Sequence, residues 1–192
     1  MSTTSTERYN SIAILLHWVM AALIIGMLIL GKYMSDFVPD SELALKFSLF
    51  QWHKSFGITV LLLAILRLAW RLGHAVPPLP DNLKSWERAA AKLTHVGFYV
   101  LIIALPLSGW AMTSASPYNI PTWLFNTIPW PHMPFVENAG NKEQLEGLFK
   151  SVHFYLGNAT ILLLILHLGA VAKHVFVLRD KILLRMWPFG QN

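Results

Sequence analysis

The chain contains no cysteine, and this absence excludes several kinds of site at once. Disulfides, iron–sulfur clusters, zinc–thiolate sites and covalently attached haem all require cysteine. Charged residues are also scarce, at 13% against 55% hydrophobic residues, and the mean hydropathy is +0.48. That balance is too apolar for a soluble domain and indicates a small polytopic membrane protein with one domain, residues 1–192. Any metal must be held by histidine or carboxylate side chains.

Long hydrophobic runs are what the chain does have, and four of them are predicted to cross the membrane as α-helices. The fold class is therefore all-α, an integral membrane four-helix bundle. The predicted spans are about 12–33, 43–72, 94–113 and 151–178. The first span is too long for the apolar core of a signal peptide and no cleavage site follows it, so we expect it to be retained. An amphipathic lead-in, 85–92, precedes the third span, and Pro106 is expected to kink it. The connection 114–141 is rich in proline and aromatic residues and is expected to cap the outer end.

The distribution of positive charge predicts the orientation. An even number of spans places both termini on one side of the membrane. That side, with the loop between the second and third spans, holds ten of the 15 Lys and Arg residues, and the other side holds five. The positive-inside rule therefore predicts cytoplasmic termini. The net charge of +5 follows membrane sidedness, so it is not taken as a sign of nucleic-acid binding.

Three histidines of the fourth span, His153, His167 and His174, lie on one helical face, because separations of 14 and 7 residues are close to whole numbers of turns. An ionisable side chain inside a membrane costs about 2–3 kcal/mol or more, so it normally faces a partner within the bundle and marks a functional path.

Four histidines fall into two depth-matched pairs once the orientation is set. His17 and His167 lie in the cytoplasmic half of the membrane, and His53 and His153 lie in the outer half. Two imidazoles from opposed helices at one depth are what a b-type haem requires, so we predict two haems b stacked across the membrane on these pairs. Separately hydrogen-bonded histidines, a proton relay and a metal transporter are the alternatives. A transporter is disfavoured because every Asp and Glu falls in a predicted loop or helix end.

His95 and His174 are both predicted at the cytoplasmic end, below the inner pair. They either snorkel to the membrane surface or donate hydrogen bonds and protons to a quinone carbonyl. Arg67 and Arg71 are expected to face lipid headgroups, with haem propionates as the alternative. On the outer side, Lys54 and Lys150 each neighbour a histidine of the outer pair. They could attract an anion, bind propionates or simply lie at the surface.

Taken in order, these motifs resemble the bacterial cytochrome b561 family, the small four-helix di-haem proteins related to the b subunit of nickel hydrogenases. The resemblance covers nearly the whole chain. It is carried by residues 14–18 (ILLHW), 51–57 (QWHKSFG), 67–71 (RLAWR), 77–78 (PP), His95, 104–106 (ALP), Gly109, 150–153 (KSVH), His167, His174 and 183–188 (LLRMWP).

The resemblance implies axial haem ligands at His17, His53, His153 and His167, in agreement with the depth argument. It also implies a location in the bacterial inner membrane and electron transfer from the outer face to ubiquinone. We place the quinone near His95 and His174 because of their predicted depth at the cytoplasmic end. Similarity to a superoxide oxidase implies superoxide as the electron donor. Lys54 and Lys150, beside the predicted outer haem, are compatible with attracting this small anion. The alternative within the family is a subunit that links a periplasmic or membrane dehydrogenase to the quinone pool.

Overall fold

A computed structural model describes residues 8–79 and 83–189 of the chain; residues 1–7, 80–82 and 190–192, and with them the ends of the predicted 1–192 domain, lie outside the described residues. Within that part, four helices are long and apolar enough to cross a membrane. The elements in order are α1 (Ser11–Asp36), α2 (Leu43–Gly73), α3 (Ser85–Ala115), β1 (Thr122–Leu124), β2 (Ile128–Trp130), α4 (Pro134–Glu137), α5 (Lys142–Ala172), the π-helix η1 (Lys173–Leu178) and the 3₁₀-helix η2 (Leu183–Arg185).

The four long helices confirm the predicted all-α membrane bundle, with longer helices than the hydrophobic runs alone suggested. The lead-in 85–92 is continuous with the third span, because α3 runs from Ser85 to Ala115 and passes Pro106 without a break. α5 begins at Lys142, well before the predicted start of the fourth span at residue 151. The helices extend into polar sequence because the backbone groups at a helix end that lack a partner can bond to water outside the membrane.

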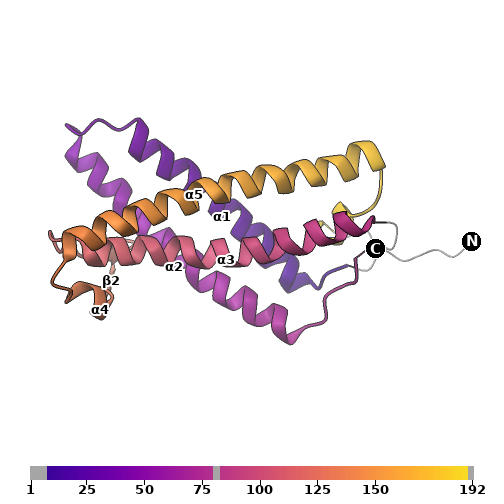
Figure 1. The fold of residues 1–192 in the computed structure, drawn as a ribbon, viewed down its shortest axis with the longest axis horizontal. Helices are drawn as coiled ribbons and strands as arrows, with labels where there is room; N and C mark the ends of the chain where they lie inside the picture. The colour runs from indigo at the N-terminus through magenta and orange to yellow at the C-terminus, as the bar shows by residue number, and fades with distance from the viewer. Residues whose placement is uncertain (1–7, 80–82, 190–192) are drawn as a thin grey trace, which may run out of the picture.

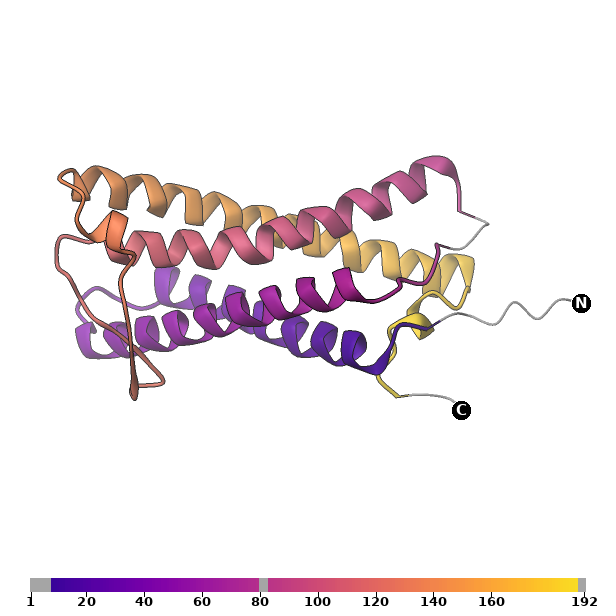
Figure 2. The same cartoon turned by 90° about the horizontal axis from the view of Figure 1, so that it is seen from below.

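The bundle consists of two helical hairpins packed side by side. Figure 2 shows α3 and α5 as one layer and α1 and α2 as the other, and the helix pairs α3–α5, α1–α2 and α2–α3 are in contact. In Figure 1, α1 crosses behind α5 at an angle, whereas the axes of the antiparallel helices α3 and α5 are nearly aligned. Met20, Ala64 and Ile102, one from each of three helices, form a buried cluster at mid-length. The outward faces of the helices carry exposed large hydrophobic side chains, as expected of surfaces that meet lipid.

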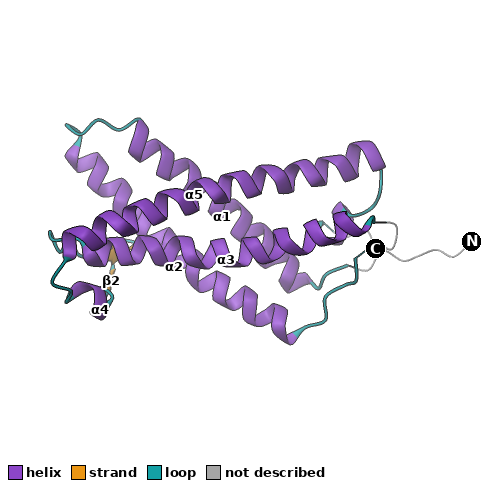
Figure 3. Ribbon diagram, in the orientation of Figure 1, coloured by secondary structure: helices purple, strands orange, loops and turns teal. Residues whose placement is uncertain are grey.

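The connection between α3 and α5 caps one end of the bundle, as predicted. It contains the hairpin β1–β2 and the short helix α4 (Figure 3). The side-chain amide of Gln51 donates to the carbonyl of Pro121 at 2.9 Å, and the backbone N–H of Phe125 donates to the hydroxyl of Ser55 at 2.9 Å. Gln51 and Ser55 are buried, so these bonds satisfy polar groups inside the cap and fix it to α2.

The first and last described segments meet at the opposite end. The backbone N–H of Tyr9 donates to the carbonyl of Arg185 at 3.2 Å, and the indole of Trp18 donates to the carbonyl of Met186 at 2.6 Å. Arg185 is buried and donates to the carbonyl of Pro78 at 2.7 Å. The ends of the described chain therefore lie on one side of the bundle, together with the loop between α2 and α3.

Candidate functional site

The structure brings together both predicted histidine pairs. The ring centroids of His53 and His153 are 6.2 Å apart, and those of His17 and His167 are 6.4 Å apart. Two imidazoles that bind one metal ion from opposite sides, each through a bond of about 2.0–2.1 Å, have centroids roughly 6 Å apart. Both pairs therefore match the spacing that an axially ligated metal needs. Each pair joins one hairpin to the other, since His17 and His53 come from α1 and α2 and their partners from α5.

Each histidine pair can supply only two ligands, so it suits a metal ion whose other ligands come from a cofactor. Residues 8–79 and 83–189 contain no group of three or more His, Cys, Asp or Glu side chains that could hold a metal. A bare zinc ion takes three or four protein ligands, whereas a haem iron takes only the two axial ones because the macrocycle supplies the others. The geometry therefore fits haem.

In the outer pair, the protein backbone orients His153. Its Nδ1 lies 3.0 Å from the carbonyl oxygen of Leu105 and 3.0 Å from the hydroxyl of Ser108. A hydrogen on Nδ1 donated to this carbonyl leaves the lone pair on Nε2, which is the tautomer that binds a metal. Leu105 is one residue before Pro106, so the proline-containing stretch of α3 supplies the carbonyl that positions the ligand.

Two glycines allow the outer rings to lie against neighbouring helices. A Cβ added at Gly109 would come within 3.0 Å of Cε1 and 3.2 Å of Nδ1 of His153. A Cβ at Gly31 would lie 3.3 Å from Cε1 of His53. Both positions are thus required to be small by the imidazole that covers them rather than by backbone conformation.

A cavity of about 810 Å³ surrounds the outer pair. It lies between the hairpins, and a volume of roughly 300–1,000 Å³ is typical of cofactor pockets. Both histidines, four glycines, Lys54 and Lys150 are among the residues that line it. The glycines are Gly31, Gly57, Gly109 and Gly157. Apolar walls with small residues leave room for a flat macrocycle, so the cavity fits a haem at this pair.

In the inner pair, aromatic side chains and an arginine replace the glycines. The ring of Trp18 meets His17 edge-on with centroids 5.4 Å apart, and Phe98 meets His167 in the same way at 5.4 Å. Arg67 lies with Nη2 at 3.3 Å from Nδ1 of His17. The expectation that Arg67 faces lipid headgroups is therefore wrong, because its half-buried side chain turns into the bundle toward the inner pair.

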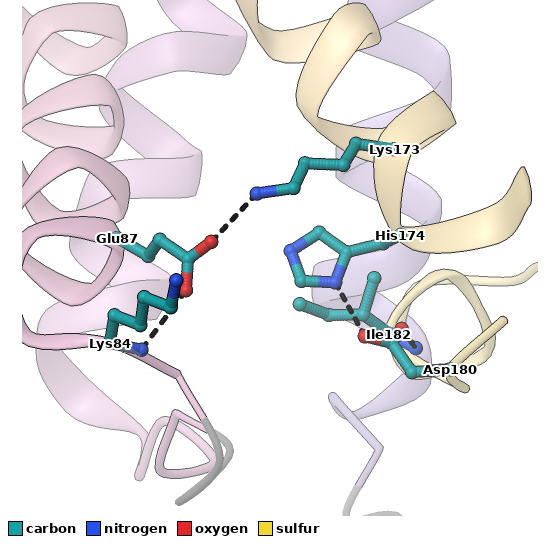
Figure 4. Close-up of polar contacts among 6 residues, drawn as sticks. All are labelled: Lys84, Glu87, Lys173, His174, Asp180 and Ile182. Carbon is teal, nitrogen blue, oxygen red and sulfur yellow. Dashed lines mark hydrogen bonds and ion pairs between the residues drawn. The ribbon is translucent and has the colours of Figure 1, made fainter. Parts of the chain in front are cut away.

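His95 and His174 have different surroundings. His95 is half-buried and within electrostatic range of Arg71 and of His167, which places it beside the inner pair. His174 lies in η1, where its Nδ1 is 2.5 Å from a carboxylate oxygen of Asp180 (Figure 4). The carboxylate partner was not predicted from the sequence, because the turn that folds Asp180 back onto the helix has no local motif.

Lys54 and Lys150 both line the outer cavity. Lys54 is half-buried and donates to the carbonyl of Pro121 at 3.3 Å, and Lys150 is exposed. Within residues 8–79 and 83–189, neither ammonium has a carboxylate within 4.0 Å, whereas Lys32 on the same wall pairs with Asp36 at 2.7 Å. Neither lysine therefore forms an ion pair within the described residues, although Glu146 lines the same cavity.

Comparison with known proteins agrees with this architecture. The family model for prokaryotic cytochrome b561 matches residues 8–189. The chain belongs to the prokaryotic cytochrome b561 family. It is 30% identical to cytochrome b561 homolog 2 of Escherichia coli over 190 residues, which cover 97% of this chain and 95% of the relative. It is also 28% identical to cytochrome b561 homolog 1 of the same organism over 182 residues (95% and 98%), and 29% identical to the probable superoxide oxidase CybB of Yersinia pestis over 187 residues (95% and 97%).

Membership of the cytochrome b561 family establishes the general role. The protein is a multi-pass protein of the bacterial inner membrane that binds haem b and takes part in electron transfer. The sequence-based recognition of the family and of its location is confirmed. Sequence reasoning missed Leu105, Ser108 and Asp180, because each becomes a histidine partner only through packing between separate segments.

Proposed function

We propose that the protein holds two haems b, one on His53 and His153 and one on His17 and His167, and transfers electrons from superoxide at the outer end to ubiquinone at the inner end. The observation that carries the proposal is the pair of matched ring separations, 6.2 Å and 6.4 Å, at two depths of one bundle. Each haem, when bound, supplies one-electron redox chemistry at its iron.

The outer end is suited to a small anionic donor. Lys54 and Lys150 both line the cavity, and cationic side chains in a partly enclosed cleft raise the local concentration of anions. The similarity to a probable superoxide oxidase supports the same donor.

The inner end is suited to quinone reduction, which consumes protons as well as electrons. His95 lies beside the inner pair, and His174 is anchored to Asp180 at the same end of the bundle. Two imidazoles there provide hydrogen-bond donors for quinone oxygens and proton donors for the reduced product.

Stopped-flow spectroscopy of the purified oxidised protein tests the proposal. A superoxide pulse is expected to reduce the haems within milliseconds, and added ubiquinone is expected to reoxidise them. Because superoxide is anionic, the rate should fall as the Debye length shrinks from ~30 Å at 0.01 M salt to ~8 Å at 0.15 M. A protein that carries both haems yet is not reduced by superoxide would overturn this assignment in favour of a partner dehydrogenase as donor.

A further inference from the structure

The segment that follows α5 folds a carboxylate back onto His174. η1 ends at Leu178, and Arg179 adopts φ 51° and ψ 36°. The backbone N–H groups of Arg179 and Asp180 both donate to the carbonyl of His174. These two bonds close the helix without help from any side chain. The carboxylate of Asp180 is therefore available for another role.

Both oxygens of this carboxylate are engaged. Oδ1 accepts a hydrogen bond from the backbone N–H of Ile182 at 3.0 Å, and Oδ2 lies 2.5 Å from Nδ1 of His174. The two side chains are largely covered, at 14% exposed for His174 and 24% for Asp180. A carboxylate fixed at one oxygen by the backbone holds the imidazole at the other in one orientation and one tautomer, with the proton on Nδ1.

Within residues 8–79 and 83–189, the second ring nitrogen of His174, Nε2, has no hydrogen-bond partner. In Figure 4 it points away from Asp180, toward the α3 side of the bundle. A histidine whose Nδ1–H is held by a carboxylate presents the lone pair of Nε2, which can take up a proton from water and pass it on. This nitrogen is therefore placed to relay a proton into the bundle.

We propose that Asp180 is a positioning residue for quinone reduction, which orients His174 so that Nε2 passes a proton from water to a quinone oxygen. This inference rests on the proposed function. The reduction takes two electrons and two protons per quinone, and two superoxide anions supply the electrons and leave as dioxygen. For one of the protons, the Nε2–H bond of His174 breaks and a quinone O–H bond forms. Water at this end of the bundle supplies that proton to Nε2, and the Nδ1–H of His174 stays hydrogen-bonded to Asp180 throughout.

A second ion pair nearby provides a matched control. Lys173 of η1 binds Glu87 of α3 at 2.7 Å and lies 5.4 Å above the ring of Trp86. Glu87 also accepts from the backbone N–H of Lys84 (Figure 4). This pair joins η1 to α3 beside His174 and also has one carboxylate and one basic side chain, but its carboxylate bonds Lys173 and not His174. Replacing Glu87 therefore tests a general loss of charge at this end of the bundle.

The first measurement is steady-state quinone reduction by the two-haem protein with superoxide as donor. Asp180→Asn keeps the shape of the side chain and removes its charge, so kcat is expected to fall by roughly tenfold or more while KM for ubiquinone stays within about twofold. Asp180→Glu should recover part of kcat, and Glu87→Gln should leave both constants nearly unchanged. An unchanged kcat in Asp180→Asn, or an equal loss in Glu87→Gln, would overturn the inference.

The second measurement does not depend on turnover. NMR of protein labelled with ¹⁵N-histidine, with the His174 signals assigned from a His174→Gln variant, reports which ring nitrogen carries hydrogen. The wild type is expected to show Nδ1 protonated at His174, and Asp180→Asn is expected to change that signal and leave the other histidines as they were. A His174 signal that is identical in both proteins would contradict the positioning role. If the wild type itself fails to reduce ubiquinone although the His174 signal responds to Asp180, the proposed function fails and the Asp180–His174 coupling stands.

Discussion

The two histidine pairs have almost the same ring separation but different surroundings. At the outer pair, a backbone carbonyl orients His153 and glycine allows its ring to approach α3. At the inner pair, aromatic edges surround the rings, and the guanidinium of Arg67 lies beside His17. The same bundle therefore gives nearly equal ring separations in two different environments. The outer rings fit where glycines leave space, and the inner rings are packed against aromatic side chains and Arg67.

Because their surroundings differ, the two pairs should respond differently to substitutions nearby. Close packing transmits small changes of volume, so the outer pair should be sensitive to added atoms. Charge acts over a longer range inside a membrane than in water, so the inner pair should be sensitive to the loss of a cation. The predictions below test this contrast, from the largest expected effect to the smallest.

The largest effect is expected from removing a histidine. His153→Ala and His17→Ala should each reduce haem from two per chain to one, because an iron that loses one axial ligand is released while the other haem keeps both. The pyridine haemochrome assay measures this content. The double variant His53→Ala/His153→Ala should also retain one haem. If the double variant inserts normally and retains none, the pairing is incorrect.

A single added carbon should distinguish the outer pair from the inner one. Gly109→Ala would place a Cβ 3.0 Å from Cε1 of His153, so the ring must move away from the carbonyl that orients it. We expect partial loss of the outer haem, or an altered spectrum of that haem alone, measured by redox-resolved absorption. Gly26→Ala is the control, because nothing lies within 4 Å of a Cβ there. Equal perturbation of both haems by Gly109→Ala would contradict a local steric cause.

The outer cations should affect the capture of superoxide and nothing at the inner pair. Lys150 is exposed on the cavity rim, so Lys150→Gln is expected to lower the second-order rate by about two- to fivefold at 0.01 M salt and to flatten its salt dependence. Lys54→Gln should act in the same direction. Lys142→Gln is a control on the same helix, since this ammonium bonds Asn119 at 2.7 Å. Stopped-flow rates that fall equally in the control would point to net charge instead of the cavity.

The smallest effect is expected from Arg67, and it should be confined to the inner pair. Arg67→Gln removes a cation next to His17, which should lower the inner midpoint potential by on the order of tens of millivolts, because a nearby positive charge favours the reduced iron. Arg67→Lys keeps the charge and should shift the potential less. Potentiometric titration resolves the two haems. If Arg67→Gln shifted the midpoint potential of the outer haem by the same amount, the effect of Arg67 would not be confined to the inner pair.

The sequence by itself determined the membrane bundle and the residues of both pairs. Four apolar runs can satisfy their backbone hydrogen bonds in lipid only as helices, and the helical period together with the alternating direction of the spans sorts the histidines by depth. Helix ends were less predictable: α3 and α5 continue into polar sequence, where propensity and water both permit a helix. The side chain of Asn10 accepts a hydrogen bond from the backbone N–H of Ala13 and caps α1.

Only the tertiary structure decided what surrounds each histidine. Leu105 orients His153 through its backbone carbonyl. Every residue has such a carbonyl, so this contact could not be predicted from the residue type. Arg67 turns inward and Asp180 folds back onto His174 because of helix rotation and the geometry of one turn, which depend on the packing of the whole bundle. Periodicity in a helical sequence fixes which residues share a face, whereas the partners of that face are set by how the helices rotate against one another.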